Sequence, residues 1–371
     1  MQPYIPSLLP PENIDWENLI PLIAQAHAEL ARYDGLLQSL INPSVLLSPL
    51  ITQEAVLSSR IEGTQASLDD VLEAEAGLDK AKNESIKADI QEIVNYRNAL
   101  ILAENELELR HISLSFVKQI HKILLKSVRG ENKQPGKFRD TQNWIGKPGS
   151  TIEQARFVPP PSYRVQDLME NWEQFLLENN FKDKLVQMAI LHAQFEIIHP
   201  FNDGNGRIGR LLIPLFLYDK KLLHRPMFYM SEYLETHRNL YYDYLLGISE
   251  NNQWQEWIEF FLKAIISQAE VNTVRAKKIN ALYEQLKPEF QKATHSQFAV
   301  SILDAFFHRP IVDASSILRL TKIKNRVTLN NILKKLTETG LIKLHKQGQG
   351  RRPNVYALPS LARIINTTSF R

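Results

Sequence analysis

Apolar residues recur three or four positions apart along most of the 371-residue chain, which is the spacing of one face of an α-helix. Alternation typical of β-strands is confined to a few short segments. The chain is therefore predicted to be mainly α, and its length suggests two or three domains. The pattern predicts helices over residues 16–40, 50–61, 87–107, 114–127, 165–177, 184–198, 208–223, 235–246 and 254–286.

The absence of cysteine excludes disulfides, thiolate catalysis and cysteine-based zinc sites. The first residues, MQPYIPSLLPPENIDWENL, lack the basic and apolar regions of a secretory signal. No apolar run approaches the roughly 20 residues that a membrane helix needs. We therefore expect a soluble, cytoplasmic protein with no membrane partner.

Charge is distributed unevenly along the chain. Residues 271–371 hold 18 Lys and Arg against 5 Asp and Glu, whereas the rest holds 26 basic and 36 acidic residues. A basic C-terminal module on an acidic body is typical of proteins that bind a polyanion through that module.

Two regions depart from the long-helix pattern. Residues 129–163 are rich in Gly, Pro and Asn, and short strand-like pieces at 143–145 and 156–158 predict a β-hairpin. A domain junction is predicted around 288–296. Beyond it, three short helices and two strand-like pieces, joined by QGQGRR, predict a winged-helix domain; the helices are at 298–307, 312–321 and 327–339, and the strands at 341–346 and 353–358.

The segment IHPFNDGNGRIGR, residues 198–210, lies between two predicted helices. Gly204, Asn205 and Gly206 can turn tightly, expose successive backbone N–H groups and lead into a helix N-terminus, which favours an anion. Arg207 and Arg210 are three residues apart and share a face of that helix. Two cations at the positive end of a helix indicate a multiply charged anion, most simply a polyphosphate.

Two further side chains in this segment suggest a reaction. Asp203 offers a carboxylate for Mg²⁺ beside the phosphates, and His199 is a natural general base for a hydroxyl. Together these residues favour phosphoryl or nucleotidyl transfer. A P-loop and an EF-hand are excluded by the missing patterns, and a His192–His199 metal pair by the spacing of seven residues along a helix.

The run HPFNDGNGRIGR resembles the signature HxFx(D/E)GNGRxxR of the Fic-domain family at every fixed position. The resemblance extends over about 290 residues: GKFRDTQNWIGKPGSTIEQARFVPPP resembles the region of the family's flap hairpin, and YYDYLL a segment that follows the signature. It implies a Fic helical bundle with a small β-hairpin flap and a C-terminal winged helix-turn-helix domain.

The resemblance implies a protein adenylyltransferase that transfers AMP from ATP to a Ser, Thr or Tyr hydroxyl of a target protein and releases pyrophosphate. It assigns His199 as the base, Asp203 as the Mg²⁺ ligand and Phe201 as the anchor of the loop. The hairpin around 149–157 would align the target backbone. The implied ATP-binding residues are Glu62, Gly204, Asn205, Gly206, Arg207, Ile208, Gly209, Arg210 and Tyr242.

The segment Ser58-Ser59-Arg60-Ile61-Glu62-Gly63 resembles the inhibitory pattern (S/T)xxxE(G/N) of the same family. In relatives with this pattern the glutamate pairs with the second arginine of the signature, here Arg210. A carboxylate at that position would occupy the place of the γ-phosphate. We therefore expect inhibition within the chain through Ser58, Glu62 and Gly63.

The expected regions are 1–100, with the inhibitory pattern, 101–290, the Fic core, and 291–371, the winged helix. The winged helix suggests DNA as a partner, although a protein contact or a homo-oligomer stays open. Two alternative functions also stay open, namely removal of AMP or transfer of another phosphate group, and a nucleotide-sensing DNA-binding regulator. The expected DNA contacts are Lys322, Lys324, Asn325, Arg326, Lys334, Lys335, Lys343, Lys346, Arg351 and Arg352.

Overall fold

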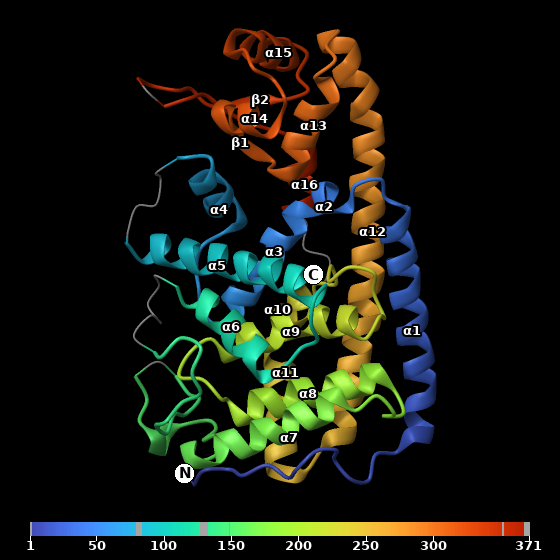
Figure 1. Cartoon of the computed structure of the whole chain (residues 1–371), viewed down its shortest axis with the longest axis vertical. Coiled ribbons are helices and arrows are strands. Elements are labelled where there is room, and N and C mark those ends of the chain that lie inside the picture. Colours follow the sequence, from blue (N-terminus) through green and yellow to red (C-terminus); the bar gives the residue numbers. More distant parts are fainter. Residues whose placement is uncertain (1, 79–83, 127–132, 148, 351, 367–371) are drawn as a thin grey trace.

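The computed structural model describes residues 2–78, 84–126, 133–147, 149–350 and 352–366. It is mainly helical with one small antiparallel sheet, as the sequence predicts (Figure 1). None of its helices is both long enough and apolar enough to cross a membrane. Arg351, one of the expected DNA contacts, lies outside the described residues.

The N-terminal region begins with a long helix that runs beside the later helix α12 (Figure 1). Asp15 caps its first turn through the backbone N–H of Asn18. A short helix that the sequence did not predict follows the inhibitory segment, and a reciprocal capping box between Ser67 and Asp70 starts it. The five helices are α1 (Trp16–Ser39), α2 (Pro43–Leu46), α3 (Ser48–Ile61), α4 (Leu68–Glu75) and α5 (Glu84–Leu107).

The central region is built around two helices that are buried over almost their whole length, α8 and α9. α9 begins at Asn205, three residues before the predicted start. Asn205 and Gly206, which were expected in the preceding turn, therefore belong to the first turn of the helix together with Arg207. The helices are α6 (Leu114–Leu124), α7 (Val165–Leu177), α8 (Lys184–Ile198), α9 (Asn205–Asp219), α10 (Ser231–Thr236) and α11 (Arg238–Asn251), with short 3₁₀ helices η1 (Ile152–Gln154) and η2 (Ser162–Arg164).

The helix α12 (Trp254–Thr294) connects the central region to the C-terminal module. It was predicted to end near residue 286, but it continues through Pro288 because buried Leu286 and Phe290 hold its last turns in place. It ends at His295, which takes a left-handed conformation. The division into three regions stays a prediction, and its boundaries at 100/101 and 290/291 lie within α5 and α12.

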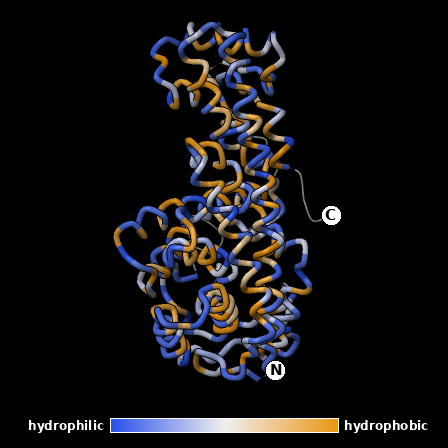
Figure 2. The backbone as a smooth tube through the Cα atoms, turned by 90° about the vertical axis from the view of Figure 1, so that its right-hand side faces the viewer, coloured by the Kyte–Doolittle hydropathy of each residue, from blue (hydrophilic) through white to orange (hydrophobic). Residues whose placement is uncertain are grey.

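The C-terminal module has the order of elements expected of a winged helix, with an additional strand and an additional last helix. The strand order is β1-β3-β2, antiparallel, with Ile311 opposite Ala357 and Lys343 on the other side of Ala357. Figure 2 shows this module as a smaller body at one end of the molecule. Its elements are α13 (Ala299–His308), β1 (Ile311–Asp313), α14 (Ala314–Leu320), α15 (Arg326–Glu338), β2 (Lys343–Lys346), β3 (Val355–Ala357) and α16 (Pro359–Asn366).

The module contacts both helices next to the inhibitory segment. Gln53 of α3 donates to the carbonyl of Ile365 in α16 at 2.9 Å. His345 of β2 lies 2.7 Å from a carboxylate oxygen of Glu73 in α4. The N-terminal helices α3 and α4 and the C-terminal module are thus packed together.

The predicted hairpin at 143–158 is reduced to one isolated bridge between Ile145 and Phe157. The connecting residues instead form the 3₁₀ helix η1, and prolines at 159–161 lack the N–H groups that would extend the pairing. On its other side, the same segment accepts a hydrogen bond at Val158 from the N–H of Tyr4, at 2.9 Å.

Candidate active site

The loop from His199 to Gly204 joins the buried ends of α8 and α9, and we call it the signature loop. Pro200 cannot continue α8, so the helix ends at His199, whose φ of 50° and ψ of 59° are left-handed. Gly204, with φ of 79°, makes the second turn and caps α9. A Cβ atom on Gly204 would also lie 3.2 Å from a methyl carbon of Leu124, which favours glycine there.

The ring of His199 is oriented by its own helix. Nδ1 lies 3.3 Å from the carbonyl oxygen of Glu196, to which it can only donate, so Nε2 keeps a free lone pair. Burial lowers the pKa of His199 to about 4, against the weaker opposing effects of the Glu196 carbonyl and of Glu62. The imidazole is therefore neutral near pH 7 and can accept a proton at Nε2.

Two side chains that the sequence analysis did not single out hold the signature loop. Arg139 donates from Nε to the carbonyl of His199 at 2.9 Å and from Nη2 to the carbonyl of Pro160 at 2.5 Å. His121 accepts from the N–H of Gly136 at Nδ1, so Nε2 donates to the carbonyl of Asp203 at 2.9 Å. These residues lie 60 and 82 positions away in sequence from their loop partners, and no spacing in the sequence connects them to the loop.

Asn205 holds the signature loop in place, in addition to its predicted role in binding ATP. Its side-chain oxygen accepts from the N–H of Phe201, and its side-chain nitrogen donates to the Phe201 carbonyl, both at 2.8 Å. The Phe201 ring is fully buried and stacks on the His121 ring at 3.8 Å between centroids. Phe201 therefore anchors the loop in the core, as the resemblance implies.

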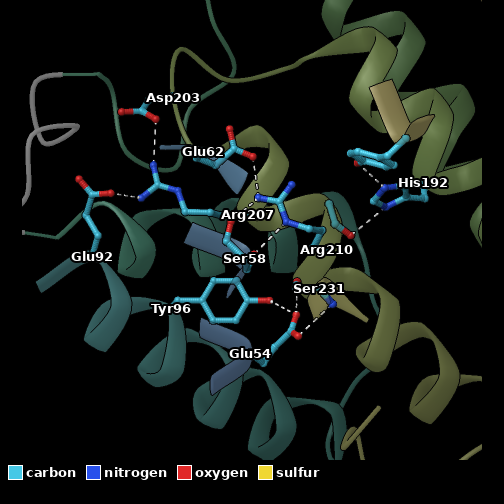
Figure 3. A network of polar contacts seen from close by, with 12 residues as sticks. Glu54, Ser58, Glu62, Glu92, Tyr96, His192, Asp203, Arg207, Arg210 and Ser231 are labelled. Carbon is cyan, nitrogen blue, oxygen red and sulfur yellow. Dashed lines mark hydrogen bonds and ion pairs between the residues drawn. The ribbon is translucent and has the colours of Figure 1, made fainter. Parts of the chain in front are cut away.

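The two arginines of the segment are buried and both are paired with carboxylates (Figure 3). Arg207 donates to Glu92 at 2.8 Å and to Asp203 at 2.9 Å. Arg210 donates from Nη2 to Glu62 at 2.6 Å, and from Nε to Oγ and from Nη2 to the carbonyl of Ser58, each at 2.9 Å. The contact between Glu62 and Arg210 that the resemblance implies is present in the structure.

The two members of this pair differ in exposure. Of the Glu62 side chain 36% is exposed, but of the Arg210 side chain only 1%. Burial raises the pKa of the Glu62 carboxyl, but the charge and the hydrogen bond of Arg210 have the opposite and larger combined effect, so the pKa lies below its ordinary value. Glu62 is therefore ionised at neutral pH. It ends α3 as the C-cap, with left-handed Gly63 following it.

The two helical glycines leave room for acidic side chains. A Cβ on Gly206 would lie 2.2 Å from Oε1 of Glu62, and a Cβ on Gly209 would lie 2.1 Å from Oε1 of Glu196. Any other residue at Gly206 would displace Glu62 from the face of α9. The sequence therefore uses glycine here for close approach and not for a turn.

A pocket opens in front of His199 and Arg210, between the end of α8, the first turn of α9, the Ile145–Phe157 bridge and α11. Its apolar side includes Tyr242, whose ring has the guanidinium groups of Arg156 and Arg238 each 5.7 Å from its centroid. The lining is Glu62, Ile145, Arg156, Phe157, Glu196, Ile197, His199, Gly206, Arg210, Tyr241, Tyr242, Leu245 and Leu246.

The structure thus brings five predicted residues to one pocket: Glu62, His199, Gly206, Arg210 and Tyr242. The other predicted ATP-binding residues and the metal ligand are not part of its lining, namely Asp203, Gly204, Asn205, Arg207, Ile208 and Gly209. Ile208 is fully buried in the hydrophobic core, and its N–H is bonded to the carbonyl of Gly204 within the helix. Gly209 packs against Glu196 and His192. A part for Ile208 and Gly209 in binding a nucleotide stays a prediction.

Asp203 is the carboxylate that the resemblance implies for a magnesium ion. In the described part of the chain, no cluster of three or more acidic or histidine side chains is arranged to hold a metal. Mg²⁺ bound with a nucleotide, however, takes most of its ligands from phosphate and water. The Asp203 carboxylate, 37% exposed beside Arg207, fits that requirement.

Two family models match the chain, one described as Fic/DOC family N-terminal over residues 20–105 and one as Fic/DOC family over residues 111–217. A probable protein adenylyltransferase of Aquifex aeolicus is 37% identical over 84 residues, which are 23% of this chain and 26% of that protein. Protein adenylyltransferase Fic of Culex quinquefasciatus is 31% identical over 161 residues, 43% of this chain and 28% of that protein. The chain thus matches little more than a quarter of these relatives' length.

Solved structures share the fold. A Fic family protein from Desulfovibrio desulfuricans superposes with a TM-score of 0.56 at 21% identity, covering 96% of this chain and 98% of that one. Fic-1 of Caenorhabditis elegans does so with a TM-score of 0.53 at 18% identity, covering 73% and 74%.

Proposed function

Since the chain belongs to the Fic/DOC family, we propose that it is a protein adenylyltransferase that moves AMP from ATP to a Ser, Thr or Tyr hydroxyl of a target protein. The observation that carries the proposal is that the free Nε2 of neutral His199 and the guanidinium of Arg210 belong to one pocket, beside the first turn of α9. The pocket is therefore lined by both a base and the N-terminus of a helix, which can bind phosphate. This combination supports transfer of a phosphorus group to a hydroxyl.

In the proposed reaction, Nε2 of His199 takes the proton of the target hydroxyl as its oxygen attacks the α-phosphorus of ATP. A new P–O bond forms to the target, the bond to the β-phosphate oxygen breaks, and pyrophosphate leaves. The first-turn N–H groups of α9 and the two arginines stabilise the negative charge. Asp203 would hold Mg²⁺, which supplies further neutralisation of the phosphates.

Inhibition within the chain is part of the proposal. The Glu62 carboxylate binds the Arg210 guanidinium that an outer phosphate would otherwise bind. ATP then competes with Glu62, or binds with its phosphates displaced from the line of attack. Ser58 holds the same guanidinium from α3 and keeps it within reach of Glu62.

One assay tests both parts. Wild type, Glu62→Gly and Glu62→Gly/His199→Ala are incubated with Mg²⁺, cell lysate and ATP labelled at the α- or the γ-phosphate. We expect weak α-label transfer by wild type, strong transfer by Glu62→Gly, none by the double variant, and no transfer of γ-label. Absence of transfer by Glu62→Gly, with release of AMP from an adenylylated protein, would instead support the removal reaction.

A second function is favoured by the C-terminal module. Lys322, Lys324 and Arg326 lie exposed around the start of α15, and they form no ion pair with any described residue. β2 adds the exposed Lys343 and Lys346 on the adjacent wing. We propose that these five residues, the basic face, bind the phosphates of double-stranded DNA, with α15 in the major groove.

The test is fluorescence anisotropy of the full-length chain with a labelled DNA duplex between 50 and 200 mM salt. Counterion release predicts that the affinity falls steeply and linearly on a log–log plot. A flat response, or no binding at the lowest salt, would leave the module with a role in protein contacts.

A further inference from the structure

One acidic side chain of the pocket has no part in the reaction proposed above. Glu196 lies three residues before His199 on α8 and lines the same pocket as Arg210 and Tyr242. Its Oε1 atom is buried and has no hydrogen-bond partner among the described residues. The atom packs against α9 at Gly209, where a Cβ would lie only 2.1 Å away.

Glu196 shares the pocket with two kinds of group. Gly206 and Arg210 belong to the first two turns of α9, the end at which that helix offers its N–H groups, and Tyr242, Leu245 and Leu246 are aromatic and apolar residues of α11. A nucleotide with its phosphates at the start of α9 and its base against α11 would occupy the pocket that Glu196 lines.

The charged groups around Glu196 come from three other elements and from its own. Arg210 of α9 favours its ionised form, but that guanidinium is already bonded to Glu62 and Ser58 of α3. Glu62 repels a second negative charge. The α11 group beside it, Tyr241, donates its hydroxyl to His192 of α8, which burial keeps neutral.

Burial, the largest effect, raises the pKa of Glu196 to about 8; Arg210 partly opposes this and Glu62 adds to it. At pH 7 the side chain is therefore a carboxylic acid with an O–H donor. An ionised carboxylate at this position would repel a triphosphate, whereas the neutral acid can approach it and donate to it.

We propose that Glu196 is a nucleotide-binding residue that works as a neutral carboxylic acid and donates its O–H to an oxygen of the ribose or the α-phosphate. This inference rests on the proposed function, because it takes the pocket to hold a nucleotide. It implies that deprotonation of Glu196, and not of the base His199, weakens nucleotide binding at alkaline pH.

The test is calorimetric titration with ATP and Mg²⁺ at pH 7.5 and 9.5 on a Glu62→Gly/His199→Ala host, which frees Arg210 and prevents transfer. We expect the host to lose about tenfold or more in affinity at pH 9.5, because burial, the main cause of the raised pKa of Glu196, does not depend on Glu62. Glu196→Gln keeps a donor and cannot ionise, so its affinity should match that of the host within about threefold at pH 7.5 and stay level at pH 9.5.

Two further arms complete the experiment. Glu196→Leu lacks the donor and should bind weakly at both pH values, with circular dichroism checking that it is folded. Adenosine in place of ATP should keep the pH response if the acceptor is on the ribose and lose it if the acceptor is the phosphate.

The outcomes separate the two proposals. A Glu196→Gln variant as pH-sensitive as the host, or a folded Glu196→Leu variant that binds as tightly as the host at pH 7.5, overturns the role of Glu196 alone. A host that binds no ATP at pH 7.5 instead contradicts the proposed function.

Discussion

The signature loop and the basic face are both rich in polar groups, but they differ in how far these groups are bonded within the protein. The loop is buried or partly buried; two of its carbonyls accept hydrogen bonds from Arg139 and His121, and the two arginines behind it are paired with carboxylates. The basic face is exposed, and its lysines and arginine have no partner among the described residues. A group that must be held at a fixed position for chemistry is bonded from within, whereas a surface that binds a polyanion leaves its charges for the ligand.

The largest effect should come from removing the proposed base, a loop group with only a weak internal hydrogen bond. His199→Ala in a Glu62→Gly host should lower the rate of AMP transfer about 10²- to 10⁴-fold, the usual contribution of a general base. Because the ring makes a single hydrogen bond at 3.3 Å, the melting temperature should barely change. A large drop in melting temperature would mean that the ring supports the loop and would weaken the contrast drawn here.

Removing an internal bond should instead cost stability. His121→Phe keeps the stack on Phe201 but leaves the Gly136 N–H and the Asp203 carbonyl without their partners. The free energy of unfolding should fall by about 1–3 kcal/mol, the cost of an unsatisfied buried group. Urea titration measures it, with exposed His295→Phe on α12's end as the matched control, and equal values for the two variants would contradict the prediction.

Releasing Arg210 should raise activity. Glu62→Gly removes a charge-assisted hydrogen bond, which is worth about 1.5–3 kcal/mol, so transfer should rise about tenfold or more. Ser58→Ala leaves the Glu62 contact in place and should raise it much less. If both variants gave the same increase, the inhibition would reside in the position of α3 and not in the carboxylate.

The pH dependence of transfer should reveal how deeply the base is buried. Protonation of His199 stops it from acting as a base, and burial moves that loss down to about pH 4. The Glu62→Gly variant should therefore keep most of its rate at pH 5.5, where a histidine with the ordinary pKa of about 6.5 would lose roughly tenfold. A midpoint near 6.5 in the initial rate would show that the ring is hydrated.

The smallest effect belongs to a single cation of the basic face. Lys324→Ala should reduce the salt dependence of DNA binding by about one unit of slope and leave the free energy of unfolding unchanged within about 0.5 kcal/mol. Lys277→Ala, exposed on α12, is the matched control and should change neither. Loss of stability in Lys324→Ala would show that this face also supports the fold.

The sequence predicted the parts of the site that lie close together in the chain. The bounds of α8 and the roles open to His199 and Arg210 follow from a contiguous segment, because local spacing fixes which side chains share a helix face. The pairing of Glu62 with Arg210, 148 residues apart, was implied only by the family resemblance. Arg139, His121 and Glu92 could not be predicted, since only tertiary packing brings them to the loop. Pairing across the flap is present but limited to the Ile145–Phe157 bridge, because prolines and η1 prevent its extension.

The hydrogen bond from Gln53 to the last helix has a practical consequence for anyone shortening this protein. Deleting residues 291–371 to isolate the enzyme would remove the acceptor at Ile365 and the wing contact of Glu73, and would bare apolar surface on the helix that carries Glu62. Activity measured on such a fragment would describe an altered inhibitor, so the regulated rate must be measured on the intact polypeptide.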